Sequence, residues 1–232
     1  METLYWSSSG LHDDPLGSHR GLPADGICWD YNAPEAIPDI VGGFRFGSAI
    51  QEADLSGPQT YATRAASGWE RAHKRAMREQ FGHALSVAAI GESLLNRKSY
   101  IDLDPTVRDA HGMPKARIQS YLDDTELSRL AFIAKKTREV IDASGAGDLF
   151  EEYGVYDAFQ PTHVFGTCRI GNDPERSVVD SYGRSHRWRN LIVADASVFP
   201  SSGGGESPAL TIETLSVRAA RHLAGRASKG EF

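Results

Sequence analysis

Cysteine is scarce in this sequence: Cys28 and Cys168 are the only two among 232 residues. Because they lie far apart, they form neither a disulfide framework nor a C-x-x-C pair for metal binding or redox exchange. The H-E-x-x-H pattern is absent as well, and cysteines and histidines do not cluster. The sequence therefore predicts no structural disulfide and no zinc site.

The chain also has no long apolar run and no excess of positive charge. No stretch approaches the roughly 20 apolar residues that cross a bilayer, and no basic-then-apolar signal peptide begins at Met1. Lysine and arginine number 25 against 31 aspartates and glutamates, so the net charge is −6. Basic residues do not alternate with aromatic ones. These features predict no transmembrane segment and no nucleic-acid partner.

Within these limits the composition is that of a folded protein. Hydrophobic residues make up 40% of the chain and charged residues 24%, an ordinary balance for a globular domain rather than a disordered one. A chain of 232 residues is long enough to bury a sizeable core, as one large domain or two small ones.

Hydrophobic periodicity divides most of the chain into predicted helices and strands. Apolar residues at helical spacing predict helices over 60–80, 124–143 and 208–225. Short apolar or alternating stretches predict strands over 3–7, 41–46, 85–90, 100–104, 116–122 and 191–194. A turn around Gly112 makes 100–104 and 116–122 a predicted hairpin, with Pro105 ending its first strand. Residues 8–38, rich in Gly, Pro, Asp and Ser, are predicted to be irregular.

The start of the last predicted helix carries chemical information. Gly203-Gly204-Gly205 precedes it, Ser207 suits its N-cap, and Pro208 suits its first turn. The first N–H groups of a helix lack intrahelical partners and carry partial positive charge, and glycines let another group approach the backbone closely. This helix end is therefore either a site for phosphate, carboxylate or a ring gaining negative charge, or a flexible connector to a capped helix.

His163 is a candidate acid or base, because histidine exchanges protons near neutral pH. It lies just before Gly166-Thr167, a pair typical of a tight turn. The residues around it leave open whether this histidine is catalytic or structural.

Two further site types are disfavoured. Gly205-Glu206-Ser207-Pro208-Ala209 nearly matches the nucleophile elbow G-x-S-x-G of hydrolases. The residue after that nucleophile must donate its backbone N–H to the oxyanion, and Pro208 has none. There is also no G-x-G-x-x-G after a predicted strand, so the chain has no dinucleotide-binding βαβ unit of its own.

The last quarter of the chain resembles the C-terminal signature of the glucose–methanol–choline (GMC) flavoprotein oxidoreductases. The matching elements occur in the family's order, at residues 163–171 (HVFGTCRIG), 177–180 (SVVD), 190–197 (NLIVADAS) and 208–212 (PALTI). Residues 96–97, 103–105 and 109–112 resemble the family's substrate domain more loosely. The resemblance therefore extends from about Glu92 to Gly225.

The resemblance implies an α+β fold. A mostly antiparallel sheet with flanking helices would form the family's substrate domain, accompanied by the closing strand and helix of an incomplete Rossmann-type FAD domain. We therefore expect residues 1–162 to form the substrate-binding domain and residues 163–232 to contribute to the FAD domain and the active site. The family passes a hydride from an alcohol or sugar to flavin, which implies FAD as cofactor and a small-molecule alcohol or sugar as substrate.

Site residues are assigned from the matching positions. His163 holds the position of the base that removes the substrate's hydroxyl proton. The positions expected to face the cofactor are Asp195, Ala196, Gly204, Gly205 and Pro208. The family usually has Asn or His directly before the helix proline as a second catalytic group. Ser207 holds that position here, and Glu206 is the alternative because the loop is one residue longer than usual.

The missing dinucleotide fingerprint leads us to expect the C-terminal part of a longer polypeptide, whose partner is an N-terminal FAD-binding segment. Alone, the chain is expected to bind FAD weakly or not at all and to be inactive. The alternative interpretation is a cofactor-less relic or a non-catalytic interaction module. The missing fingerprint and the departure at Ser207 support that alternative.

Overall fold

The computed structural model describes residues 3–20, 26–33, 42–51, 53–157, 163–203 and 205–231. The chain divides into two compact units that interleave in sequence. One unit consists of Met1–Thr3, Ser93–Asp123 and Pro161–Phe232, and the other of Leu4–Glu92 and Asp124–Gln160. We call them the C-terminal unit and the sheet unit. The prediction that 1–162 binds substrate and 163–232 serves the cofactor concerns function and stays a prediction.

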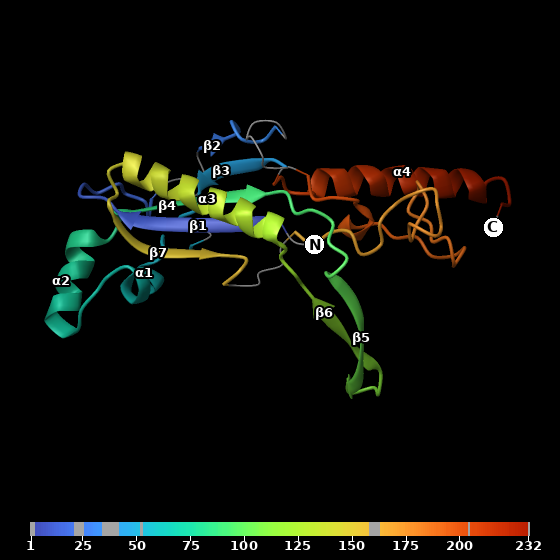
Figure 1. Cartoon of the computed structure of the whole chain (residues 1–232), viewed down its shortest axis with the longest axis horizontal. Helices are drawn as coiled ribbons and strands as arrows, with labels where there is room; N and C mark the ends of the chain where they lie inside the picture. The colour runs from blue at the N-terminus through green and yellow to red at the C-terminus, as the bar shows by residue number, and fades with distance from the viewer. Residues whose placement is uncertain are drawn as a thin grey trace. The chain divides into compact units, whose positions relative to one another are not determined.

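An antiparallel sheet forms the sheet unit, with strand order β2-β3-β4-β1-β7 (Figure 1). Its strands are β1 (Leu4–Leu11), β2 (Ile27–Cys28), β3 (Phe44–Ser48), β4 (Ala84–Gly91) and β7 (Asp148–Gly154). The central strands β1 and β4 pair along their full length, from Leu4 opposite Gly91 to Leu11 opposite Ala84. The predicted strands at 3–7, 41–46 and 85–90 correspond to β1, β3 and β4.

Helix α3 (Asp124–Ala143) covers one face of this sheet (Figure 1). Its apolar stripe is buried, and Gly145 comes after it with a φ of +86°, the left-handed conformation that favours glycine after a helix. Gly10 of β1 allows the close approach, because a Cβ there would lie 2.8 Å from the Ile141 side chain and 2.6 Å from a backbone oxygen. The predicted 124–143 helix is confirmed.

Polar side chains also link α3 to the sheet. Ser8 of β1 lies 2.7 Å from the Thr137 hydroxyl and donates to Glu152 of β7 at 2.8 Å. Arg138 of α3 binds the same carboxylate at 2.7 Å. Burial raises the pKa of Glu152, but the hydrogen bonds from Arg138 and Ser8 outweigh burial and hold this pKa below its usual range.

Strand alternation places Ser7, Ser9 and Ser86 on the opposite face. These serines are buried, and the Ser86 hydroxyl lies 3.3 Å from that of Ser7 and 2.8 Å from that of Ser9. The buried hydroxyls therefore satisfy one another.

Helices α1 (Pro58–Arg64) and α2 (Glu70–Gln80) contribute side chains to a second core of the sheet unit, centred on Tyr61. The Tyr61 side chain is fully buried, its ring meets Phe81 edge to face at 5.2 Å, and its hydroxyl donates to the Gln80 carbonyl. Burial raises the pKa of Tyr61 from 10.0 to about 12. The folded state therefore keeps this proton to higher pH than the unfolded state does.

This difference predicts a pH dependence of stability. The contribution of neutral Tyr61 is complete below pH 10 and is lost as the pH rises toward about 12. The free energy of unfolding should fall by on the order of 2 kcal/mol across that window, as measured by urea unfolding. In Tyr61→Phe the free energy of unfolding should not show this decrease. In Tyr156→Phe, which alters an exposed tyrosine, the decrease should remain. An identical fall in wild type and Tyr61→Phe would contradict the assignment.

In the C-terminal unit, strands β5 (Tyr100–Arg108) and β6 (Pro114–Gln119) form the predicted hairpin. Pro105 does not end the first strand, contrary to prediction. Instead the pairing shifts between Leu103 and Arg108, and this irregularity accommodates a residue without a backbone N–H. Asp104 accepts hydrogen bonds from the N–H groups of Thr106 and Val107 at the shift, both at 2.8 Å.

Other differences from the predictions have local causes. The helix predicted over 60–80 is two helices, because the chain turns between them at Gly68, whose φ is +97°. Residues 8–38 are not wholly irregular: β1 continues to Leu11 and β2 lies within this range, of which 21–25 and 34–38 lie outside the described residues. Strand β7 was not predicted.

The predicted strand at 191–194 is also absent from the structure. A strand requires a neighbour to bond, and this stretch forms one isolated bridge, between Ile192 and Arg184. The predicted 208–225 helix is confirmed as α4 (Ala209–Ala227). The α+β class with an antiparallel sheet and flanking helices is also confirmed. Each helix in the described part of the chain is too short or too polar to span a membrane.

Candidate active site

The candidate site lies in the C-terminal unit, where residues 163–170 run beside a short 3₁₀ helix, η1 (Ala196–Val198). Backbone hydrogen bonds join the two segments, from Cys168 N–H to the Ser197 carbonyl and from Ile170 N–H to the Val198 carbonyl, both at 2.8 Å. The segment that carries His163 is thereby fixed to the segment that carries Asp195 and Ala196.

A shared core supports both segments and α4. Its buried residues are Phe165, Val179, Ala196, Val198 and Phe199. The Phe165 and Phe199 rings stack with their centroids 5.8 Å apart. Ile212 and Leu215 from the first half of α4 pack against this cluster. Apolar burial thus places the start of α4 next to the 163–170 and 195–199 segments.

Asp195 begins η1. Its carboxylate accepts a hydrogen bond from the Ser197 N–H at 2.8 Å, the usual arrangement of an N-cap. The Asp195 side chain is exposed, while Ala196 behind it is buried. Two predicted cofactor residues are therefore adjacent, one open to solvent and one part of the core.

A tight turn at residues 180–184 closes the core on another side. The Asp180 carboxylate accepts the N–H groups of Tyr182 and Arg184, at 2.8 and 3.0 Å. Gly183 has a φ of +76°, and a Cβ there would lie 2.5 Å from the Val193 carbonyl oxygen. Only glycine allows this approach of two backbone segments.

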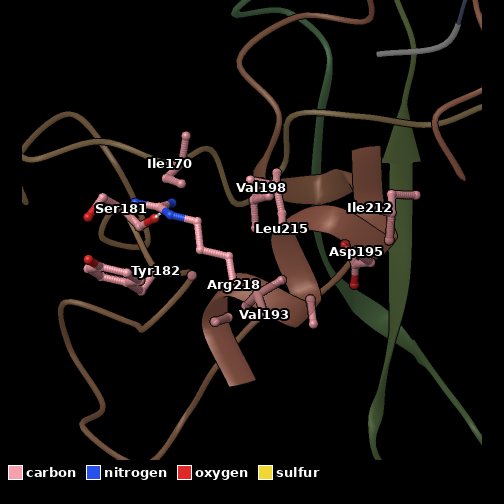
Figure 2. Close-up of a pocket in the computed structure, with 12 residues that line it drawn as sticks. Ile170, Ser181, Tyr182, Val193, Asp195, Val198, Ile212, Leu215 and Arg218 are labelled. Carbon is pink, nitrogen blue, oxygen red and sulfur yellow. Dashed lines mark hydrogen bonds between the residues drawn. The ribbon is translucent and has the colours of Figure 1, made fainter. Parts of the chain in front are cut away.

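The interior between this turn and α4 is closely packed. Figure 2 shows Val193, Val198 and Leu215 gathered there, with the Arg218 side chain extended toward Ser181. Arg218 donates to the Ser181 carbonyl at 2.5 Å and lies 4.4 Å from the Tyr182 ring, which in turn stacks on His222 at 3.7 Å. The cavity there measures about 10 Å³, room for a single water at most, so side chains fill most of this interior.

The N-terminus of α4 differs slightly from the prediction. Pro208 holds the N-cap position, with φ −80° and ψ −5°, and no side chain caps the helix there. Ser207, which was predicted to be the N-cap, is exposed and lies one residue before it. Because no side chain of the described residues caps the first N–H groups of α4, these groups retain the donor capacity and partial positive charge of a helix start.

The loop before α4 is glycine-rich and strongly turned. Gly203 and Gly205 have φ values of +65° and +85°, and the Gly205 N–H donates to the Gly203 carbonyl at 2.7 Å. Gly205 is buried, whereas Glu206 and Ser207 are exposed. Gly204, a predicted cofactor residue, lies outside the described residues.

His163 is half-buried and precedes a second glycine turn. Gly166 there has a φ of +85° and its N–H lies 3.4 Å from the Ala196 carbonyl. His163 is thus on the segment anchored to Ala196, and Ser207 directly precedes the N-cap of the helix that packs on the same core. Residues of α4 line three cavities among the described residues, but His163 lines none of these three. The convergence of His163 and α4 on one pocket therefore stays a prediction.

One site feature escaped the sequence analysis. The Ser202 hydroxyl, in the loop before α4, accepts the Ser93 N–H at 2.8 Å, and both residues are buried. The two serines are far apart in sequence, and no local pattern links them.

Comparison with known proteins gives three findings. A family model described as "GMC oxidoreductase" matches residues 95–216, more than half of the chain. The 2-methyl-1,2-propanediol dehydrogenase of Mycolicibacterium austroafricanum is 31% identical over 194 residues, 82% of this chain and 35% of that protein. The gluconate 2-dehydrogenase flavoprotein of Pantoea cypripedii is 28% identical over 165 residues, 67% of this chain and 26% of that protein.

A solved structure shares the fold. The pyridoxine 4-oxidase of Mesorbium loti matches 96% of this chain and 42% of its own length, with a TM-score of 0.59 and 14% sequence identity. The chain therefore spans less than half of the length of each of these relatives.

Proposed function

Since the chain belongs to the GMC oxidoreductase family, we propose that it is the C-terminal part of an FAD-dependent enzyme that oxidises an alcohol or sugar hydroxyl to a carbonyl. The observation that carries the proposal is the shared core described above. It anchors the His163 segment, η1 and the uncapped start of α4 to one another.

The residues present fit a flavin. A flavin ring gains negative charge when it is reduced, and an uncapped helix start presents its N–H groups to such a charge. Gly203 and Gly205, with positive φ values, place no side chain next to it. On this proposal Asp195, Ala196, Gly205 and Pro208 hold the cofactor, together with the predicted position Gly204.

In the proposed mechanism, His163 removes the proton from the substrate hydroxyl as the carbon–hydrogen bond breaks. FAD, when bound, supplies the hydride acceptor. The N–H groups at the start of α4 would favour negative charge on that acceptor. Ser207, or Glu206 in its place, orients the substrate oxygen toward His163. Both residues are exposed on the loop before α4, where a substrate can reach them.

The partner of this chain, on the same proposal, is an N-terminal FAD-binding segment. The outer face of α4 supports this partner. Leu210 is 75% exposed and Val217 50% exposed, and both line an open groove of about 500 Å³ along the helix. The other residues that line this groove, Glu213, Thr214, Arg218 and Arg221, are polar, so Leu210 and Val217 offer the partner two apolar contacts within a mixed surface.

The proposal is tested by preparing the chain alone and the chain extended by its upstream coding sequence. The chain alone should not bind FAD stoichiometrically, as judged from visible absorption. The extended protein should bind FAD, and alcohols or sugars should bleach the flavin absorption under anaerobic conditions.

Two results would count against it. Tight stoichiometric FAD binding by the chain alone would remove the need for the partner segment. An extended protein whose bound flavin no alcohol or sugar reduces would favour the non-catalytic alternative.

A further inference from the structure

The loop from Phe199 to Pro208 carries both candidates for the second catalytic group. Its first end is fixed by Phe199, which is buried in the core of the C-terminal unit. Its second end is fixed where the Ile212 N–H donates to the Pro208 carbonyl at 2.9 Å, closing the first turn of α4. Glu206 and Ser207 lie near the second end and are exposed.

Ser202 anchors this loop between its ends. Its hydroxyl oxygen accepts the Ser93 N–H at 2.8 Å, and it lies 3.5 Å from the Ser93 carbonyl oxygen. Ser202 is 7% exposed and Ser93 4% exposed, so water does not compete freely for this bond. Ser93 is the residue at which the chain enters the C-terminal unit after β4.

The anchor matters because the loop beyond it is rich in glycine. Gly203 directly follows Ser202, Gly205 lies two positions further on, and both have positive φ values. Glycine has the greatest backbone freedom in the unfolded or loosened chain. Without the hydrogen bond at Ser202, the backbone of these glycines would have more freedom. The positions of Glu206 and Ser207 would then be less well defined.

We infer that Ser202 is a positioning residue, which acts through its hydrogen bond to Ser93 and holds Glu206 and Ser207 where the substrate oxygen binds. The inference rests on the proposed function. Ser202 itself is buried, so the inference assigns it no contact with the substrate. A hydroxyl is suited to this task because it accepts the N–H and keeps a proton of its own to donate.

The test compares variants of the FAD-loaded enzyme by anaerobic rapid mixing with substrate. Ser202→Ala removes the acceptor and leaves the Ser93 N–H buried without it. Because small displacements of catalytic groups have large effects, the rate constant for flavin reduction should fall by roughly 10- to 100-fold. The substrate dissociation constant should change little. Ser202→Thr, which keeps the hydroxyl, should recover most of the rate.

Ser201→Ala is the matched control. Ser201 is the preceding serine, is half-buried, and has no side-chain hydrogen bond among the described residues. Its substitution should leave the rate unchanged. All rates are measured well below the thermal midpoints of the variants, so a role limited to stability would lower the midpoint and leave the reduction rate intact. A lower thermal midpoint with an unchanged reduction rate in Ser202→Ala would overturn the inference.

Ser202→Cys serves if the alanine variant does not fold. A thiol has nearly the same shape but is a weak hydrogen-bonding group, so the reduction rate should again fall, and a wild-type rate would overturn the inference. The proposed function is tested separately by His163→Ala. If His163→Ala slows reduction and the Ser202 variants do not, only the inference fails. If His163→Ala has no effect, the proposed mechanism fails.

Discussion

Substitution of His163 by alanine in the FAD-loaded enzyme should slow flavin reduction by a factor of roughly 10² to 10⁴, the usual contribution of a general base. Substrate binding should change far less. The reason is that His163 is proposed to act on the proton that leaves during bond breaking, while the substrate is held by other groups. The measurement is the rate constant and amplitude of flavin bleaching as a function of substrate concentration, which separates the chemical step from binding.

The control is His73→Ala. His73 is likewise half-buried but belongs to α2 of the sheet unit, so its loss should not affect the reduction rate. Equal reduction rates in wild type and His163→Ala would remove His163 from the role of base. A rise in the dissociation constant at an unchanged limiting rate would instead identify His163 as a binding residue.

Substitution of Phe44 by alanine should lower the free energy of unfolding by about 3–5 kcal/mol. Phe44 is 0% exposed on the α3 side of the sheet. Its ring lies over Gly91 of β4, where a Cβ would come within 2.3 Å of it. Phe132 of α3 lies 5.9 Å from the ring, and the Arg129 guanidinium 5.2 Å from it. With glycine below the ring and Phe132 and Arg129 beside it, substitution by alanine leaves a cavity that the neighbouring side chains cannot readily fill.

Urea unfolding followed by circular dichroism measures this loss. Trp69→Ala removes an aromatic side chain that is 82% exposed at the start of α2, and it should change stability by less than about 0.5 kcal/mol. A Phe44→Ala protein as stable as Trp69→Ala would show that the contacts of Phe44 contribute little to the folded state.

Elements with strong local signals could be predicted from the sequence. Helix α3 has a continuous apolar stripe and a glycine stop, and the β5–β6 hairpin has two alternating strands around Gly112. Strand β7 has no such signal. Its place beside β1 depends on pairing with residues more than a hundred positions earlier, which no local window contains.

The same distinction applies to the candidate site. The glycine loop, α4 and the histidine turn could be recognised from residue types and order. The bond between Ser202 and Ser93 could not, because it joins residues 109 positions apart. Ser207 was expected to cap α4, but Pro208 adopts helical angles at the N-cap position and leaves Ser207 outside the helix.

The interleaving of the two units limits how this protein can be rearranged. The chain leaves the sheet unit at Glu92, builds the β5–β6 hairpin within the C-terminal unit, and returns at Asp124. A chimera joined at any single position after β4 and before α3 would divide the sheet unit, because β1 to β4 would come from one parent and α3 and β7 from the other. Exchange of substrate preference between relatives by grafting one contiguous cassette should therefore be harder here than in proteins whose modules succeed one another along the chain.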